Sequence, residues 1–131
     1  MERPRTTSAS PYEAAYGFAR AVRVGNRILV AGTAPVERDG TSTPGDAAAQ
    51  TRRCFAIILG AIEELGGSAA DVVRTRMFIT DPADADAIGA VHGEIFRDVR
   101  PTSTMVVVAA LLRPEWRIEI EAEALLEHET D

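Results

Sequence analysis

The amino-acid sequence predicts an α+β domain in which two helices cover one face of a mixed β-sheet. The prediction depends on a hairpin pattern, two stretches of helical periodicity and three further segments rich in β-forming residues. In chain order these segments are residues 21–31, 46–65, 72–79, 81–95, 104–110 and 117–125. The expected order is therefore β-β-α-β-α-β-β, and two helices suffice to cover one face of such a sheet.

The hairpin is expected at residues 21–31. The segments Ala21–Val24 and Arg27–Ala31 are joined by Gly25-Asn26, a pair that tolerates the positive φ of a two-residue primed turn. Gly32-Thr33-Ala34-Pro35 then interrupts the second strand. Residues 1–15 contain prolines, serines and threonines, and we expect them to form an irregular surface segment.

Two amphipathic helices follow from apolar spacings of three and four. The first begins at Asp46 and ends at Gly66-Gly67, as a glycine past a helix terminus favours. Its expected buried face is Ala47, Gln50, Thr51, Cys54, Ile58, Ala61, Ile62 and Leu65. The second begins with Asp81 as N-cap and Pro82 at its first position. Its expected buried face is Ala87, Ile88, Val91 and Ile95.

The remaining strands carry apolar residues on more than one face. Val72–Ile79 is rich in β-formers, and the nearly continuous apolar run Thr104–Ala110 is typical of a strand covered on both faces. Arg117–Leu125 alternates strictly, with glutamates on one face and Ile118, Ile120, Ala122 and Ala124 on the other. Since two helices cover only one face of the sheet, these patterns predict a homo-oligomer.

Length and composition favour one globular domain spanning residues 1–131, with an acidic tail at 126–131. Of the residues, 46% are hydrophobic and 26% charged, and the formal net charge of −6 argues against a nucleic-acid partner. The single cysteine, Cys54, excludes an intrachain disulfide and is expected in the core. No apolar run is long enough to span a membrane and no secretory signal is evident, so we expect a cytoplasmic protein with no membrane association.

The acidic ladder Glu119, Glu121 and Glu123 is the most informative candidate for function. Carboxylates two residues apart on a strand lie about 7 Å apart on one face. One interpretation is a solvated sheet face whose glutamates pair with Arg74 and Arg76 across strands. The other is that one glutamate, partly desolvated at a subunit interface, binds an amine or activates water.

The other polar residues carry weaker signals. His92 is expected at the boundary of the second helix and His128 in the acidic tail, and neither belongs to a metal-binding pattern. The sequence contains no phosphate-binding loop and no nucleophile elbow. We therefore expect no metal and no cofactor.

Several segments resemble the Rid family, the reactive-intermediate deaminases also called YjgF/YER057c/UK114 proteins. They are Gly17–Asn26, Val30–Pro35, Ala49–Thr51, Asp71–Thr75, the signature Arg100-Pro101-Thr102-Ser103-Thr104 with Ala109 and Leu111, and Ile118–Ala122. The resemblance covers residues 17–125. It implies a chorismate-mutase-like fold that assembles as a homotrimer, with a small-molecule cleft between each pair of neighbouring subunits.

The resemblance also assigns site residues. Glu119 matches the family's cleft glutamate and is the expected catalytic group, while Phe18, Gly32, Thr33, Ser103, Thr104, Glu121 and Arg20 are expected to bind ligand. In the deaminating members an arginine occupies the position of Ser103 and binds the substrate carboxylate, which bidentate guanidinium pairing does well. The family's cleft tyrosine corresponds to Phe18. These departures make 2-aminoacrylate an unfavourable substrate and indicate an arginine-lacking subgroup, with Arg20 as a candidate replacement for the missing cation.

Three functions remain open at the level of sequence. The first is a deaminase-type hydrolase that cleaves the C–N bond of a small imine, enamine or related metabolite. The second is a non-catalytic module that binds a small metabolite in the same cleft. The third is the endoribonuclease or translation-inhibitor activity attached to the family, which the acidic net charge of −6 disfavours.

Overall fold

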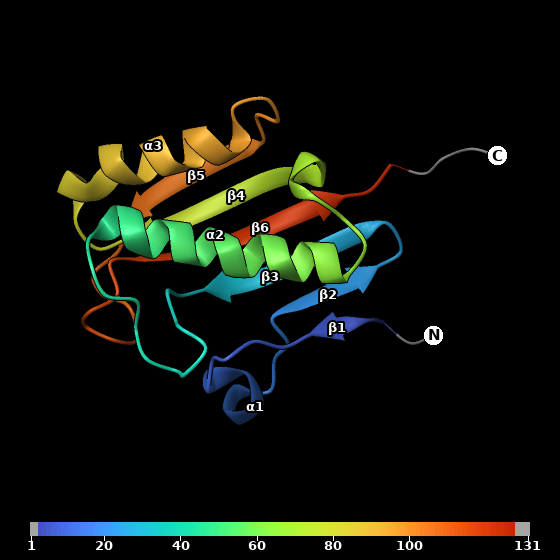
Figure 1. Cartoon of the computed structure of the whole chain (residues 1–131), viewed down its shortest axis with the longest axis horizontal. Coiled ribbons are helices and arrows are strands. Elements are labelled where there is room, and N and C mark those ends of the chain that lie inside the picture. Colours follow the sequence, from blue (N-terminus) through green and yellow to red (C-terminus); the bar gives the residue numbers. More distant parts are fainter. Residues whose placement is uncertain (1–2, 128–131) are drawn as a thin grey trace.

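The computed structural model describes residues 3–127, which form a six-stranded mixed sheet with two long helices on one face (Figure 1). In order across the sheet the strands are β1 (Arg5–Thr6), β2 (Ala21–Val24), β3 (Arg27–Thr33), β6 (Ile118–Leu125), β4 (Val72–Ile79) and β5 (Thr102–Val107). Only the β4–β5 pair is parallel, and the other neighbours are antiparallel. The predicted mixed α+β sheet is confirmed.

The predicted hairpin is formed by β2 and β3. Its turn takes a positive φ of 62° at Gly25. Asn26 does not adopt a positive φ, since Arg100 is the single non-glycine residue that does so in the described range. Arg23 steadies the turn by donating from Nε to the Gly25 carbonyl at 2.8 Å. The glycine therefore fixes the register that brings Val30 and its neighbours onto β6.

The expectation that residues 1–15 are irregular is wrong for two short segments. Arg5 and Thr6 add β1 to the edge of the sheet, and Tyr12–Tyr16 form a short helix, α1. β1 is held by its pairing with β2, and α1 is held by the buried Glu13, which pairs with Arg20. This N-terminal segment packs beside β2 rather than running free over the surface (Figure 1).

The first predicted helix is observed as α2 (Ala47–Glu64), N-capped by Asp46, whose side chain accepts from the Ala49 amide at 2.9 Å. Every residue of its predicted face is buried, and Gly66 follows the helix with φ 97°. Gly67 and Ser68 then lead through a 3₁₀ turn, η1 (Ala69–Asp71), into β4. The periodic spacing of apolar residues thus predicted the buried face of α2, although it omitted Phe55, which is also fully buried.

The second predicted helix begins later than expected. Asp81 and Pro82 start a 3₁₀ turn, η2 (Pro82–Asp84), and the α-helix itself, α3, runs over Ala85–Phe96. Ile88 and Val91 are buried as predicted, but Ala87 is exposed. Ala87 precedes Ile88 by one residue and is therefore turned about 100° around the helix from the buried face.

The prediction that Thr104–Ala110 is covered on both faces is wrong within this chain. The strand observed there, β5, ends at Val107 and lies at the edge of the sheet, paired with β4 alone. Val106 and Val107 are exposed. A second chain that covers this edge, as the oligomer prediction requires, stays a prediction.

The two faces of the sheet differ as the alternation on β6 predicted. Ile118, Ile120, Ala122 and Ala124 are buried beneath the helices, and the three glutamates lie on the opposite face. No helix within residues 3–127 is both long and apolar enough to cross a bilayer. His128 and most of the predicted acidic tail lie outside the described residues.

We expect Ile120→Ala to lower the free energy of unfolding by roughly 2–5 kcal/mol, the usual cost of removing a buried isoleucine side chain. Ile120 is fully buried in a strand at the centre of the sheet. Urea unfolding at fixed protein concentration measures the change. Leu125→Ala, in the same strand but 43% exposed, is the matched control, and an equal loss there would contradict a core beneath α2.

Candidate functional site

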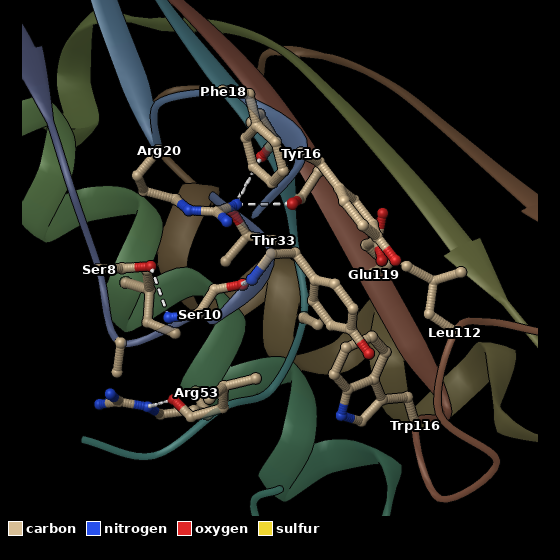
Figure 2. A pocket seen from close by; sticks show the side chains of 17 residues that line it. Ser8, Ser10, Tyr16, Phe18, Arg20, Thr33, Arg53, Leu112, Trp116 and Glu119 are labelled. Carbon is tan, nitrogen blue, oxygen red and sulfur yellow. Dashed lines mark hydrogen bonds between the residues drawn. The ribbon is translucent and has the colours of Figure 1, made fainter. Parts of the chain in front are cut away.

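A cavity of about 310 Å³ lies where α1, the end of β3 and the segment preceding β6 meet. Its lining includes Ser8 and Ser10 from the N-terminal segment, Gly32 and Thr33 from β3, and Trp116 and Glu119 at the start of β6. Figure 2 shows Glu119 on the same side of the cavity as Tyr16 and Trp116, with Arg20 and Arg53 on the opposite side.

A β-bulge shapes the wall formed by β3. Val30 lies opposite Ala122 and Thr33 lies opposite Ile120, so three steps along β3 match two steps along β6. The extra residue falls at Ala31-Gly32. Bulges of this kind bend a strand and re-aim its groups, and they are common beside binding sites.

Gly32 is required by the position of the Glu119 carboxylate. A Cβ atom at residue 32 would lie 2.5 Å from Oε2 of Glu119, closer than such atoms approach one another. The absence of a side chain at the bulge therefore creates the space that the carboxylate occupies. Glycine, whose backbone φ is not positive here, is selected by close approach rather than by conformation.

Glu119 is half-buried, and its carboxylate has no hydrogen-bond donor within bonding distance in the described range. Burial raises the pKa of Glu119, an effect that nearby Arg20 opposes and nearby Glu121 reinforces. Its neighbour on β4 is Phe78, which offers no charge or hydrogen bond. A carboxylate in this setting is available to a ligand and takes up a proton more readily than an exposed one.

Arg20 is buried and already paired. Its Nε lies 3.1 Å from a carboxylate oxygen of Glu13, and its Nη1 donates to the Gly32 carbonyl at 2.6 Å and to Thr33 Oγ1 at 2.9 Å. The guanidinium also lies over the ring of Phe18, 5.5 Å from its centroid. These contacts hold the bulge against α1 and occupy Nε and Nη1 of Arg20 before any ligand binds. The suggested role of Arg20 as a replacement for the missing cation stays a prediction.

Aromatic side chains that the sequence analysis did not single out form much of the wall. Tyr12 and Tyr16 lie one helical turn apart on α1 with their ring centroids 5.2 Å apart, and Trp116 meets Tyr12 edge-on at 6.1 Å. The indole Nε1 donates to Ser42 Oγ at 2.9 Å. The i, i+4 spacing of the two tyrosines is the one feature of the sequence that could have pointed to a shared helical face, although it was not used in the sequence analysis.

The expected site residues fall into two groups. Phe18, Arg20, Gly32, Thr33 and Glu119 line the cavity. Three others do not line it in this chain: Ser103, Thr104 and Glu121. The Ser103 hydroxyl accepts from Thr75 Oγ1 at 2.7 Å, on the helix side of the sheet, and Glu121 pairs with Arg76 at 2.9 Å. A ligand contact from these residues requires a second subunit and stays a prediction.

The remaining candidates are structural in this chain. His92 Nε2 lies 2.9 Å from Thr75 Oγ1 and its ring packs on Phe96, and burial lowers the pKa of His92. Cys54 is fully buried, and burial raises the pKa of its thiol, which leaves it unreactive. No cluster of three or more His, Cys, Asp or Glu residues suited to a metal ion occurs within residues 3–127.

Comparison with known proteins decides the family. A family model described as Endoribonuclease L-PSP matches residues 7–126. The chain belongs to this family. The crystal structure of Rv2704 from Mycobacterium tuberculosis, described as a member of the YjgF/YER057c/UK114 family, matches with a TM-score of 0.85 and 41% identity over 95% of this chain and 100% of that one.

Two curated relatives extend the comparison. SCO2049 of Streptomyces coelicolor, an uncharacterized protein, is 39% identical over 92% of this chain and 90% of its own length. The 3-aminoacrylate deaminase RutC of Acinetobacter baylyi is 36% identical over 82% of this chain and 85% of its own. The Endoribonuclease L-PSP family thus includes a named deaminase similar to this chain, and it carries a nuclease description as well.

We expect Glu119→Gln to stabilise the protein at pH 7.5 but not at pH 4. The folded-state pKa of Glu119 is raised above its ordinary value of 4.5, so the ionised carboxylate destabilises the fold as pH rises through that window. Glutamine removes this penalty, and the advantage disappears where the wild-type carboxyl is already protonated. Urea unfolding at both pH values measures it.

The control is Glu123→Gln, on the same strand and face, where the glutamate meets Arg27 at 3.4 Å. Its effect should stay within about 0.5 kcal/mol at either pH, as is usual for exposed pairs. A stability gain for Glu119→Gln that does not depend on pH would contradict a desolvated carboxylate.

We expect Gly32→Ala to displace the Glu119 carboxylate from its recess and to lower the pKa of Glu119 towards the ordinary value. The new Cβ would lie 2.5 Å from Oε2, too close for both atoms to keep their places, and the glutamate is the flexible partner that yields. A carboxyl-carbon NMR titration of Glu119 measures the shift. Gly60→Ala, where a Cβ meets nothing within 4 Å, is the control and should leave the titration of Glu119 unchanged.

Proposed function

We propose that this protein is a deaminase-type hydrolase that cleaves the C–N bond of a small imine or enamine in the cavity beside Glu119. The proposal depends chiefly on one observation, a half-buried carboxylate that faces a cavity of about 310 Å³ without a bonded partner in the described chain. Desolvated carboxylates with raised pKa values are concentrated at catalytic sites. The similarity to a named 3-aminoacrylate deaminase supports the same class of reaction.

The proposed reaction adds water across the C=N bond. A protonated imine and one water give a carbonyl compound and an ammonium ion, with no change in total charge. Glu119 accepts a proton from the attacking water, which forms a carbinolamine, and returns a proton to nitrogen as the C–N bond breaks. The raised pKa of Glu119 suits both transfers, because a general acid–base group works best when its pKa approaches the working pH.

The substrate differs from the α-imino acids favoured by members of the family that have the arginine. Ser103 stands at the arginine position, and a hydroxyl cannot replace a guanidinium as an anion clamp. Arg20 is held by Glu13 and by the carbonyl of Gly32. Deamination of 2-aminoacrylate is therefore not the proposed activity.

We further propose that the working form is a homotrimer with the cavity in each intersubunit cleft. Val106 and Val107 on the edge strand are exposed in the single chain, and so is Leu112, which also lines the cavity. Burial of such apolar surface is the main driving force of subunit association. A neighbouring subunit would close the cavity and bring further groups to it.

A non-catalytic binding module is the second candidate. It is favoured by the composition of the wall, in which Glu119 is the single carboxylate among the cavity-lining residues of the described chain. The endoribonuclease named in the family description ranks third. Arg76 on the open sheet face is paired with Glu121, and the net charge is −6, so no basic surface for phosphates is formed there.

We expect the purified protein to accelerate ammonia release from imines generated in situ by amine and amino-acid oxidases. Glu119→Gln should lower the rate above background by about 10²-fold or more, as removal of a general acid–base group does. Glu123→Gln is the matched control and should retain the wild-type rate. If wild type and Glu119→Gln both equal the protein-free rate across the panel, hydrolysis of this substrate class is excluded and the binding module becomes the better explanation.

A further inference from the structure

We infer that the cavity selects a cationic ligand without a carboxylate, so that the substrate class is a protonated imine derived from a simple amine rather than from an amino acid. This inference deepens the proposed function of the same cavity and rests on it for the reaction, although the charge preference can be measured without turnover. It follows from the charges around the cavity, taken one at a time.

The nearest cation is compensated within the fold. Arg20 is 3% exposed and bonds Glu13 through Nε, while its Nη1 is directed at the carbonyl oxygen of Gly32 and the hydroxyl of Thr33. Glu13, itself buried, neutralises the charge of this guanidinium, so a ligand carboxylate that approached the remaining nitrogen, Nη2, would meet a cation that is already paired. Arg20 therefore supplies rigidity at the bulge and little net positive charge to a ligand.

The second cation is also engaged and points elsewhere. Arg53, from α2, donates from Nε to the Val36 carbonyl at 2.9 Å and lies 3.5 Å from a carboxylate oxygen of Glu37. Figure 2 shows its guanidinium directed away from Glu119, on the other side of the cavity from that carboxylate. A ligand carboxylate beside Glu119 would thus be out of reach of Arg53.

Glu119 is left as the charge without a bonded counterpart. Glu119 is the one carboxylic acid among the residues that line the cavity. No cation in the described part of the chain forms an ion pair with it. A ligand carboxylate placed here would meet a like charge, which is unfavourable. A ligand ammonium or iminium would instead complete an ion pair.

The aromatic wall favours the same sign of charge. Tyr12, Tyr16 and Trp116 line the cavity, and aromatic faces attract cations through their quadrupoles. Phe18 and Trp116 already accept arginine side chains in this way, Arg20 at 5.5 Å and Arg113 at 5.2 Å. The apolar rings also suit a ligand whose remaining part is hydrocarbon.

The chemistry of hydrolysis requires the same charge. Water attacks the protonated imine, RCH=NH₂⁺, far more readily than the neutral one, and an opposed carboxylate stabilises the protonated form. The balanced step is RCH=NH₂⁺ + H₂O giving RCHO + NH₄⁺. An anionic group beside the nitrogen therefore binds the reactive form of the substrate and stands in position to take the proton of the water.

Two oxidase-generated imines with the same side chain test the inference. 2-Phenylethylamine with a flavin amine oxidase and L-phenylalanine with an L-amino-acid oxidase give imines that differ only in the carboxylate. We expect the rate of ammonia release above background to be at least about tenfold greater for the imine without a carboxylate, since a like charge beside Glu119 is unfavourable. Glu119→Gln should remove the preference together with the rate, and Glu123→Gln should keep both.

A binding measurement separates the charge preference from catalysis. Calorimetry with 2-phenylethylammonium and with 3-phenylpropionate, two probes of similar shape and opposite charge, should show at least tenfold tighter binding of the cation to wild type, for the same electrostatic reason. The affinity for the cation should fall in Glu119→Gln and persist in Glu123→Gln.

The outcomes distinguish this inference from the proposed function. If the imine of phenylalanine is hydrolysed as fast or faster, or 3-phenylpropionate binds as tightly as the cation, the charge preference is wrong and the hydrolase proposal still stands. If neither imine is hydrolysed but the cation binds through Glu119, the hydrolase proposal fails and the charge preference is supported. If neither probe binds and neither imine reacts, both are wrong.

Discussion

The buried pair between Arg20 and Glu13 is the interaction that the architecture of the site depends on. One guanidinium joins α1, through Glu13, to the bulge of β3, through the carbonyl of Gly32 and the hydroxyl of Thr33. Without it the N-terminal segment would have little to bind to, because β1 is only two residues long and α1 only five. Helices this short are unstable alone, so tertiary contacts must hold them.

That pair also determines the electrostatics of the cavity. Arg20 forms its ion pair with Glu13 and stabilises the fold. Glu119, on β6, has no ion pair in the described chain. The bulge at Gly32 is the link between the two, since it offers its carbonyl to Arg20 and its missing side chain to Glu119. Gly32 therefore takes part both in holding α1, through Arg20, and in placing the Glu119 carboxylate beside the cavity.

How far the sequence could predict this arrangement depends on the range of the contacts involved. The buried face of α2 and the alternation of β6 follow from local periodicity, and both are confirmed. The wall formed by α1 was missed because a five-residue helix between Pro11 and Gly17 has almost no periodic signal. The exposed position of β5 was missed for another reason, since an apolar strand looks the same in sequence whether helices or a second subunit cover it.

The three glutamates of β6 show why pattern alone left two interpretations open. Their spacing makes them equivalent in sequence, but their neighbours across the strands differ. Glu121 meets Arg76 and Glu123 meets Arg27, which is the solvated and paired ladder of the first interpretation. Glu119 faces Phe78 on one side and the glycine bulge on the other, so it alone of the three has no ion pair in the described chain and is partly shielded from water. In the proposed function a cationic ligand supplies the charge that the fold does not place beside Glu119, which offsets the cost of partly burying an ionised carboxylate.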